Sequence, residues 1–254
     1  MFFIISFIIS IFLLDKNKNW VELFNGNNLD GWEIKITGYK LGKNYRNTFK
    51  VQDGAIKVSY EDYKKFGGRF GHIFYTKNEF QNYVLSLDYK FSGEHLKGAP
   101  GWSIKNSGVM LHSQNPYTML KNQEFPVSAE AQLLGGIGSG DRTTGNICTP
   151  GIDVDINNIK AENHCINSKS MTYDDKWVNI KIIVYSDSLI HHVVESDTVL
   201  TYSNLRVGGE FIPKNYQSRV GESLKKGYIS LQSEGHPVAF RNIKIREIFK
   251  KSKP

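Results

Sequence analysis

The sequence predicts an all-β fold, a sandwich of two antiparallel sheets in the jelly-roll class. Three observations support this prediction. Short runs of alternating apolar and polar residues recur along the chain, turn residues separate them, and helical periodicity is almost absent. The length of 254 residues is enough for one large β domain after a leader is subtracted. We therefore expect one domain over residues 20–250.

The expected strands follow in order. Residues 20–24 form the first, and residues 48–51 and 55–59 flank Asp53-Gly54, a strong hairpin signal. Residues 83–91 alternate cleanly, and residues 177–185, 189–195 and 198–202 predict a meander. The chain closes with strands at 227–232 and 238–248, the last with a bulge between Phe240 and Ile243.

Two segments depart from this pattern. Residues 116–125 predict one or two helical turns after the Asn115-Pro116 start. Residues 135–170 are rich in Gly, Asn, Thr and Asp and have poor apolar spacing, so we expect a long loop region there. Long ordered loops on a sandwich usually carry function.

The N-terminal segment reads as an export signal. Residues 1–14 are almost entirely apolar, and Asp15 begins an abrupt polar stretch. This run is short for a membrane span, which needs about 20 residues, and matches the apolar part of a secretory leader. We expect a leader over residues 1–19, no stable membrane span, and a periplasmic or extracellular protein; a buried N-terminal strand is the alternative.

Cysteine and charge content restrict the partners. Cys148 and Cys165 are not in a zinc-type pair, and an exported protein could join them in a disulfide or keep two free thiols. The net charge of +7 comes from scattered Lys and Arg, so we expect no nucleic-acid partner. The sequence does not predict the oligomeric state.

The segment from Trp102 to Leu134 carries the strongest functional signal. In its first strand Met110, His112 and Gln114 share one side, and in its second Glu130 and Gln132 do. Because side chains alternate between the two faces of a sheet, an imidazole, a carboxylate and amides are expected on one open face. Such a face suits a sugar, which presents many hydroxyl groups.

Several motifs together resemble a known family. The chain opens with LFNGNNLDGW at residues 23–32 and continues with NSGV at 106–109, EAQ at 130–132 and WVN at 177–179. It ends with GYISLQ at 227–232 and FRNI at 240–243. This order resembles the 3-keto-disaccharide hydrolase family, although many members have Arg where His112 stands. The resemblance implies a concanavalin A-like sandwich, export from a bacterial cell and activity on keto-sugars.

A 3-keto sugar can be cleaved by removing the acidified hydrogen at C2, after which the C1 substituent leaves and water adds later. This route needs a base, an acid and a stabiliser for the enolate oxygen. We expect His112, Glu130 and His164 to supply the catalytic groups and to hold a divalent metal ion of unknown identity. Structural roles compete for each of the three, and Asp153 and Asp155 could instead hold calcium.

A second set of residues is expected to bind the carbohydrate substrate or to assist the chemistry. Core packing competes for the tryptophans, and Glu234 and His236 are also secondary catalytic candidates. The set comprises Trp102, Asn106, Ser107, Gln132, Arg142, Trp177, Gln232, Glu234 and His236.

Two other functions fit the same fold. A non-catalytic carbohydrate-binding module would need the aromatic face but no acid–base groups. A classical retaining glucanase needs two carboxylates about 5–5.5 Å apart. The usual strand motif for that pair is incomplete here, because Glu195-Ser196-Asp197 lacks its second Glu.

Overall fold

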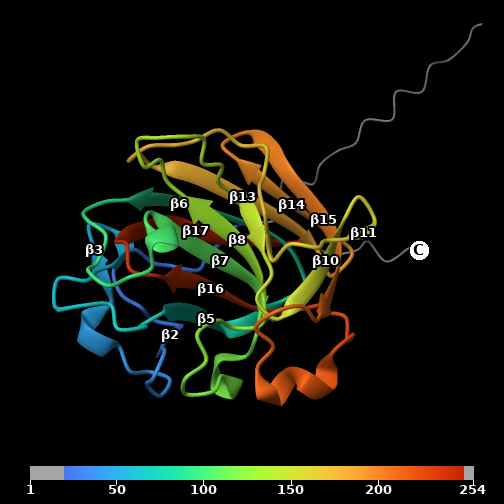
Figure 1. Cartoon of the computed structure of the whole chain (residues 1–254), viewed down its shortest axis with the longest axis horizontal. Helices are drawn as coiled ribbons and strands as arrows, with labels where there is room; N and C mark the ends of the chain where they lie inside the picture. Colours follow the sequence, from blue (N-terminus) through green and yellow to red (C-terminus); the bar gives the residue numbers. More distant parts are fainter. Residues whose placement is uncertain (1–19, 249–254) are drawn as a thin grey trace, which may run out of the picture.

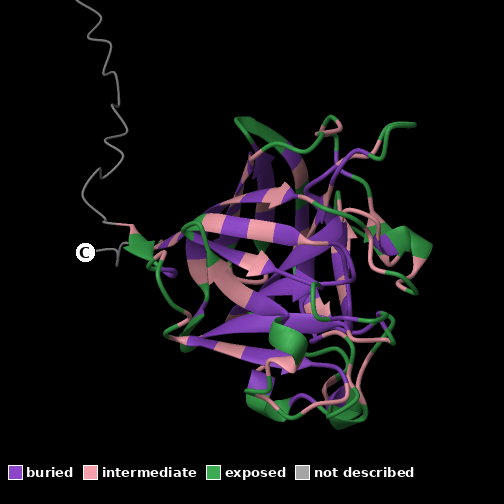
Figure 2. Cartoon of the chain, turned by 90° about the vertical axis from the view of Figure 1, so that its left-hand side faces the viewer, coloured by how far each residue is buried: buried purple, intermediate pink, exposed green. Residues whose placement is uncertain are grey.

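The structure is a computed structural model that describes residues 20–248, so the expected leader at 1–19 lies outside the described residues. The chain forms two antiparallel sheets that pack face to face (Figure 1). In Figure 2 the strands of both sheets are mostly buried or intermediate, and the exposed residues lie mainly in the connecting segments. The predicted two-sheet β-sandwich is thus confirmed. No helix of the described part is long and apolar enough to cross a membrane.

The smaller sheet has seven strands. In spatial order they are β12 (Cys165–Ile166), β9 (Asn146–Cys148), β8 (Ala129–Leu134), β7 (Asn106–Ser113), β16 (Gly227–Ser233), β5 (Gly71–Phe80) and β2 (Trp32–Ile36).

The larger sheet has ten strands, and β1 (Val21–Glu22) joins it by pairing with β17. The other strands, in spatial order, are β11 (Ile159–Lys160), β10 (Ile152–Ile156), β15 (Asp197–Val207), β14 (Leu189–Val194), β13 (Val178–Tyr185), β6 (Asn82–Phe91), β17 (Val238–Glu247), β4 (Ala55–Val58) and β3 (Phe49–Gln52). Short 3₁₀ helices lie in the connections: η1 (Tyr45–Asn47), η2 (Gly101–Ser103), η3 (Pro116–Thr118) and η4 (Lys214–Arg219).

The core lies between the sheets and follows the alternation of the strands. Val109 of β7 and Leu231 of β16 point inward from the smaller sheet and meet Leu85 of β6 and Ile182 of β13. Each is at most 1% exposed, and burying such a side chain contributes about 1.5–3 kcal/mol. In β7, β8 and β16 the residues that alternate with the inward-facing ones therefore point outward. These residues form the outer face of the smaller sheet, which carries a pocket.

Most predicted elements are confirmed. Asp53 and Gly54 have φ of 53° and 69° and connect β3 to β4, and β13, β14 and β15 form the meander. The register of β17 shifts between Arg241 and Lys244, where the bulge was expected. Asn115 caps η3 by accepting a hydrogen bond from the backbone of Tyr117.

The expectation of a long loop over residues 135–170 is wrong. This segment contains the four short strands β9 to β12, which extend one edge of both sheets. Its strands are only two to five residues long, so the alternation is too brief to stand out among the turn residues. The segment nevertheless borders the pocket.

Candidate active site

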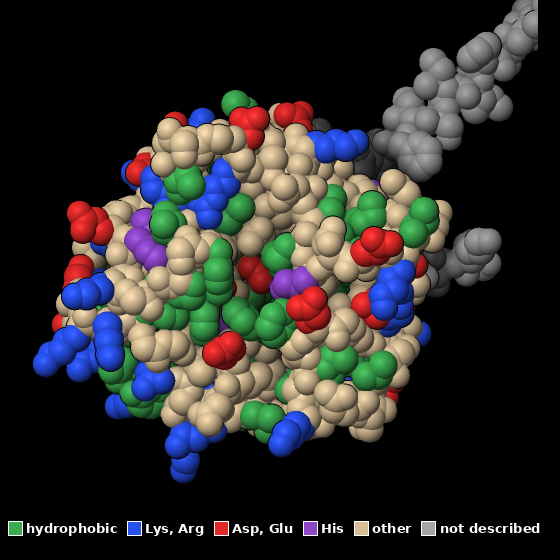
Figure 3. Space-filling model, viewed as in Figure 1, with side chains coloured by type: hydrophobic (Ala, Val, Ile, Leu, Met, Phe, Trp, Pro, Cys, Tyr) green, Lys and Arg blue, Asp and Glu red, His purple; other side chains and the backbone are tan. Residues whose placement is uncertain are grey.

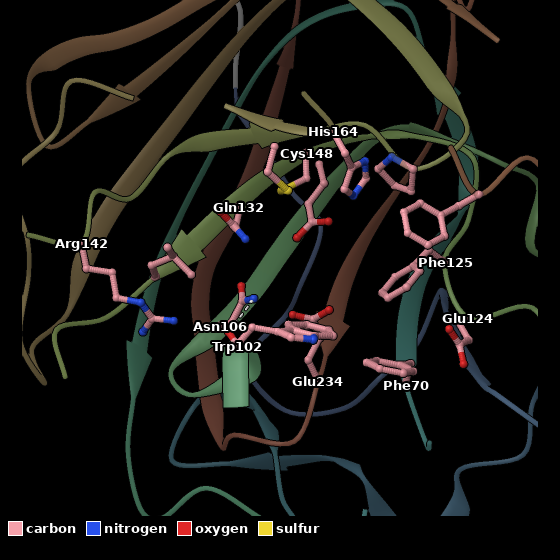
Figure 4. Close-up of a pocket in the computed structure, with 15 residues that line it drawn as sticks. Phe70, Trp102, Asn106, Glu124, Phe125, Gln132, Arg142, Cys148, His164 and Glu234 are labelled. Carbon is pink, nitrogen blue, oxygen red and sulfur yellow. Dashed lines mark hydrogen bonds between the residues drawn. A yellow bond between two sulfur atoms is a disulfide. The ribbon is translucent and has the colours of Figure 1, made fainter. Parts of the chain in front are cut away.

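A pocket of about 420 Å³ opens on the outer face of the smaller sheet. Figure 3 shows this face hollowed near its centre, with apolar side chains around the opening and acidic atoms inside it. Strands β7, β8 and β9 form the floor, and the segments before β5, after η3 and after β15 form the walls. Most of the lining residues fall into a polar group, a pair of buried carboxyl groups and an aromatic group, and a third carboxyl group, Glu124, lies on the aromatic side (Figure 4).

The carboxyl pair is Glu130 of β8 and Glu234 after β16. Glu130 leans across β7 at Gly108: a Cβ atom on residue 108 would lie 2.5 Å from Glu130 Oε1, so only glycine leaves room for this carboxyl group. The two side chains are 6% and 3% exposed.

The two carboxyl groups influence each other's pKa. Burial raises the pKa of Glu130 to about 8, although the nearby amide of Gln232 lowers it somewhat. Burial and the nearby charge of Glu130 raise the pKa of Glu234 well above its usual range. The pair therefore retains at least one proton near neutral pH, as expected for two carboxyl groups in one dry site. One group can act as an acid while the other acts as a base.

Amide and guanidinium groups lie on one side of this pair. Gln132 Oε1 accepts a hydrogen bond from Asn146 at 3.0 Å, which leaves Gln132 Nε2 as the donor for a ligand. Arg142 donates to the carbonyl of Gly135 at 2.7 Å and to that of Lys105 at 3.2 Å, so its side chain is fixed. Asn106 lines the same side. These groups suit the hydroxyl and keto oxygens of a sugar.

Aromatic rings form the opposite side. The rings of Phe70 and Trp102 are parallel within 2°, with centroids 5.9 Å apart, and Phe125 packs against Phe70 at 5.1 Å. Phe211 meets Phe125 at 5.9 Å. Figure 4 shows Arg142 and Gln132 on one side of the pocket and Phe70 and Phe125 on the other. The pocket thus has a polar side and an apolar side.

Of the two alternatives for the cysteines, a disulfide or two free thiols, the structure contains the disulfide. Cys148 of β9 and Cys165 of β12 are direct cross-strand partners and are bonded. Both line the pocket, and the bond holds the preceding residue, His164, at the rim. The ring of His164 packs on Phe211 with centroids 4.9 Å apart, and burial lowers its pKa. A disulfide is consistent with the expected export.

The alternation that predicted His112 beside Glu130 fails at a bulge. Ser230 pairs with Met110 but Tyr228 pairs with Ser113, so β7 has an extra residue at this point. His112 takes φ of 47°, and its backbone approaches Gly227 too closely for any Cβ atom there. The side chain therefore turns out of the pocket.

The surroundings of His112 are those of a structural residue. Its Nε2 lies 3.1 Å from the carbonyl oxygen of Ser186, and its ring meets Tyr83 at 5.9 Å. Tyr83 belongs to β6 of the larger sheet, and Ser186 lies in the turn between β13 and β14 of the same sheet. His112 therefore joins the two layers at one end of the sandwich. Burial lowers its pKa to about 4, which keeps it neutral.

Four other candidates also lie outside the pocket lining, and Gln232 is one of them. Ser107 points toward the interior and donates to the carbonyl of Gln232 at 2.8 Å. Trp177 lies on the outer face of the larger sheet, where the Arg241 guanidinium stands 3.9 Å above its ring. His236 is buried behind the pocket, with its ring 5.9 Å from that of Phe91 and stacked on His95.

Gln232 and two residues that were not predicted extend the polar floor beneath the pocket. Lys35 of β2, His72 of β5 and Gln232 of β16 are successive cross-strand partners and are almost fully buried. Burial and the charge of Lys35 lower the pKa of His72 to about 3. Lys35 and His72 alternate with apolar neighbours in the sequence, which predicts that both point outward. Nothing local showed that Phe125 would pack against His72 or that Lys35 would donate to the carbonyl of Lys121.

The predicted metal ligands do not come together. Glu130 and His164 line the pocket, whereas His112 faces the larger sheet. Within residues 20–248, the one group of three potential ligands whose atoms lie within 4.8 Å of one another is Cys148, His164 and Cys165. Its two sulfur atoms are bonded to each other, so they are not thiolates. The donor set does not fit the expected three-ligand ion, and the reaction proposed below uses none.

Comparison with known proteins places this geometry in context. The sequence model of the "3-keto-alpha-glucoside-1,2-lyase-like domain" family matches residues 19–246. No curated protein matches the sequence of the chain.

Two solved structures share the fold. One is a proposed glycosyl hydrolase from Parabacteroides distasonis, 19% identical, with a TM-score of 0.52 and coverage of 91% of this chain and 94% of that one. The other is the exoplasmic/lumenal domain of VIP36 in its Ca²⁺/Man2-bound form, 8% identical, with a TM-score of 0.51 and coverage of 92% and 89%. The second is a lectin-like sandwich, which agrees with the predicted fold class.

Proposed function

Because this chain belongs to the 3-keto-alpha-glucoside-1,2-lyase-like domain family, we propose that it cleaves 3-keto-glycosides in the pocket of the smaller sheet. The observation that carries the proposal is the buried carboxyl pair of Glu130 and Glu234 between a polar and an aromatic side. The family and the fold support a carbohydrate-related function, and the pair supplies the acid–base chemistry.

The reaction begins at C2 of the sugar ring. The ionised carboxyl group of the pair removes the C2 proton, and the C2–H electrons form an enolate with the neighbouring ketone. The C1–O bond then breaks as the enolate collapses to a C1=C2 double bond conjugated with the ketone. The leaving oxygen takes a proton from the protonated carboxyl group. Water later adds OH to C1 and H to C2, so the net result is hydrolysis.

Each part of the pocket has a role in this scheme. We assign the base to Glu130, because its raised pKa of about 8 gives it the basicity that a carboxylate in water lacks. Glu234 serves as the acid. Arg142 and Gln132 Nε2 donate to the oxygens of the sugar, and charge-assisted donors at the 3-oxygen would stabilise the enolate. His164 lies at the rim, where its neutral imidazole can form a hydrogen bond with the leaving group.

Incubation with a glucoside and with its 3-keto form tests the proposal. The keto form should be cleaved and the ordinary glucoside should be inert, because only the ketone acidifies C2. In deuterium oxide, the hydrolysed product should carry deuterium at C2. Cleavage of ordinary glucosides without the label would favour the glucanase, and sugar binding without turnover of any keto-sugar would favour the binding module.

A further inference from the structure

A second hollow adjoins the pocket, and the proposed chemistry does not use it. This outer groove, of about 400 Å³, lies beyond the aromatic side of the pocket. The two hollows share Glu124, Phe125 and Phe211 as their common wall. A ligand that leaves the pocket on its aromatic side therefore passes directly over Phe125 and Phe211 into the groove.

The groove is apolar in character. Leu120, Phe125, Phe211, Ile212 and Pro213 supply most of its surface. Gln123 is also there, but its amide donates to Gln114 and to the carbonyl of Phe125 and accepts from the backbone of Leu120. Its amide is thus already occupied by the protein. Asn122, Glu124 and Lys214 also line the groove, but most of its exposed lining is apolar, so it offers more contact to an apolar group than to the hydroxyl groups of a sugar.

The shared wall is held in a costly conformation. Phe211 has φ of 61°, a region that glycine favours, and its side chain is 52% exposed. A large side chain in this region is strained, and the conformation persists where surrounding contacts determine it. An exposed aromatic ring held at the boundary of two hollows is a suitable surface for a ligand that spans both.

From this arrangement we propose that the outer groove is a subsite for an apolar, aromatic leaving group, so that the substrate is the 3-keto-glycoside of an extended aromatic alcohol. The inference rests on the proposed function. The sugar lies against Arg142 and Gln132, the C1–O bond lies over the carboxyl pair, and the leaving group runs along the aromatic side into the groove.

Three 3-keto-glucosides test this subsite, one each with a methyl, a 4-phenylphenyl and a glucosyl leaving group. The variant is Leu120→Asn, because Leu120 lines the groove and not the pocket and is 41% exposed. We expect kcat/KM for the 4-phenylphenyl substrate to fall about fivefold, since part of one leucine surface is lost to the ligand. The values for the methyl and glucosyl substrates should not change.

Two further variants serve as controls. Leu120→Met should retain the activity on the 4-phenylphenyl substrate, because methionine keeps an apolar surface there. Ile159→Asn makes an equivalent change at an exposed position of β11 and should affect none of the substrates. Equal losses on all three substrates, no loss at all, or a loss on the glucosyl substrate as well would each overturn the proposal.

Binding separates a failure of the subsite from a failure of the proposed function. If no 3-keto-glucoside is cleaved, the affinity of unoxidised 4-phenylphenyl glucoside for the intact protein can still be measured by calorimetry. Leu120→Asn should weaken this binding about fivefold and leave binding of methyl glucoside unchanged. Equal affinity of the wild type and the variant for the aromatic ligand would exclude the subsite.

Discussion

The carboxyl groups on the outer faces of the two sheets differ in whether they have a cationic partner. On the larger sheet, Asp88 accepts hydrogen bonds from Asn179 at 2.8 Å and Asn242 at 2.6 Å and forms an ion pair with Arg241. On the smaller sheet, Glu130 and Glu234 are buried together without a cationic partner in any ion pair of the described residues. The first arrangement stabilises its charges, and the second does not.

This difference supports the proposal that the smaller sheet carries the active site. Burying a carboxyl group without a partner costs free energy and favours its neutral form. A fold retains such a pair where reactivity is needed, because strongly perturbed acids in a cleft are typical of active sites. Charges on the larger sheet need only a structural explanation.

The largest expected effect comes from removing the base. Glu130→Gln should lower kcat on a 3-keto-glucoside at least about 100-fold, because an amide cannot remove the C2 proton. Glu130→Gln combined with Glu234→Gln should cost little more than the first change alone, since the two groups act as one unit. Initial rates at saturating substrate measure both effects.

Asp88→Asn on the opposite sheet is the matched control and should leave kcat within about twofold of the wild type. Equal losses from Asp88→Asn and Glu130→Gln would remove the functional distinction between the two faces.

The edge shared by the two sheets offers a second contrast. The smaller sheet ends in the Cys148–Cys165 disulfide, whereas the larger sheet ends in the ion pairs Lys160–Asp153 and Arg206–Asp155. Replacing both cysteines by serine should lower the free energy of unfolding by about 3 kcal/mol, as expected for a closed loop of this length. Urea denaturation measures this loss of stability.

Lys160→Ala is the comparison at the edge of the larger sheet. It should lower the free energy of unfolding by less than about 1 kcal/mol, because exposed ion pairs contribute little. A larger loss from Lys160→Ala than from replacing the cysteines would reverse this contrast.

The carboxyl pair also predicts how stability depends on pH. The pKa of Glu130 is raised in the folded state to about 8 from 4.5, so folding favours its protonated form. This contribution is complete below pH 4.5 and is lost as the pH rises toward 8. The stability advantage of Glu130→Gln over the wild type should therefore grow by about 3 kcal/mol between pH 5.5 and pH 8 in urea titrations.

Glu61→Gln is the control for this slope. Its hydrogen bond and ion pair with Lys50 lower the pKa of Glu61, so that carboxyl group stays ionised across the same pH range. The variant should have the pH dependence of the wild type. A wild type whose stability does not fall relative to Glu130→Gln would mean that the carboxyl group is not held protonated by the fold.

The sequence predicted the sandwich well because its strands alternate over many residues. The strand from Val178 to Tyr185 alternates between buried and more exposed residues along its length, and the strand from Asn82 to Phe91 does so in its second half. Burial on one face enforces this period of two. The same reasoning placed Glu130 and Gln132 correctly on the open face, since β8 pairs regularly with β7. Strands β9 to β12 were missed because two to five residues give too short a pattern.

The site was harder to predict than the fold. One extra residue in β7 turned His112 to the other layer, and no local signal marked that bulge before the partner strand was known. Trp177 and Trp102 occur in similar polar surroundings in the sequence, yet only Trp102 lies at the pocket. Both outcomes depend on long-range pairing, which a pattern of a few residues does not contain.

These two tryptophans provide the last and smallest test. Trp102 is 55% exposed at the pocket and stacks parallel to Phe70, so a ligand can cover its free surface. Trp102→Ala should raise KM for a 3-keto-glucoside about fivefold with little change in kcat, because it removes contact area but no acid or base. Trp177→Ala removes an equally large ring from beneath Arg241 and should leave KM unchanged. Steady-state kinetics of the two variants decide between a binding surface and packing alone, because a rise in KM of the same size in both would show that the losses are not specific to the pocket.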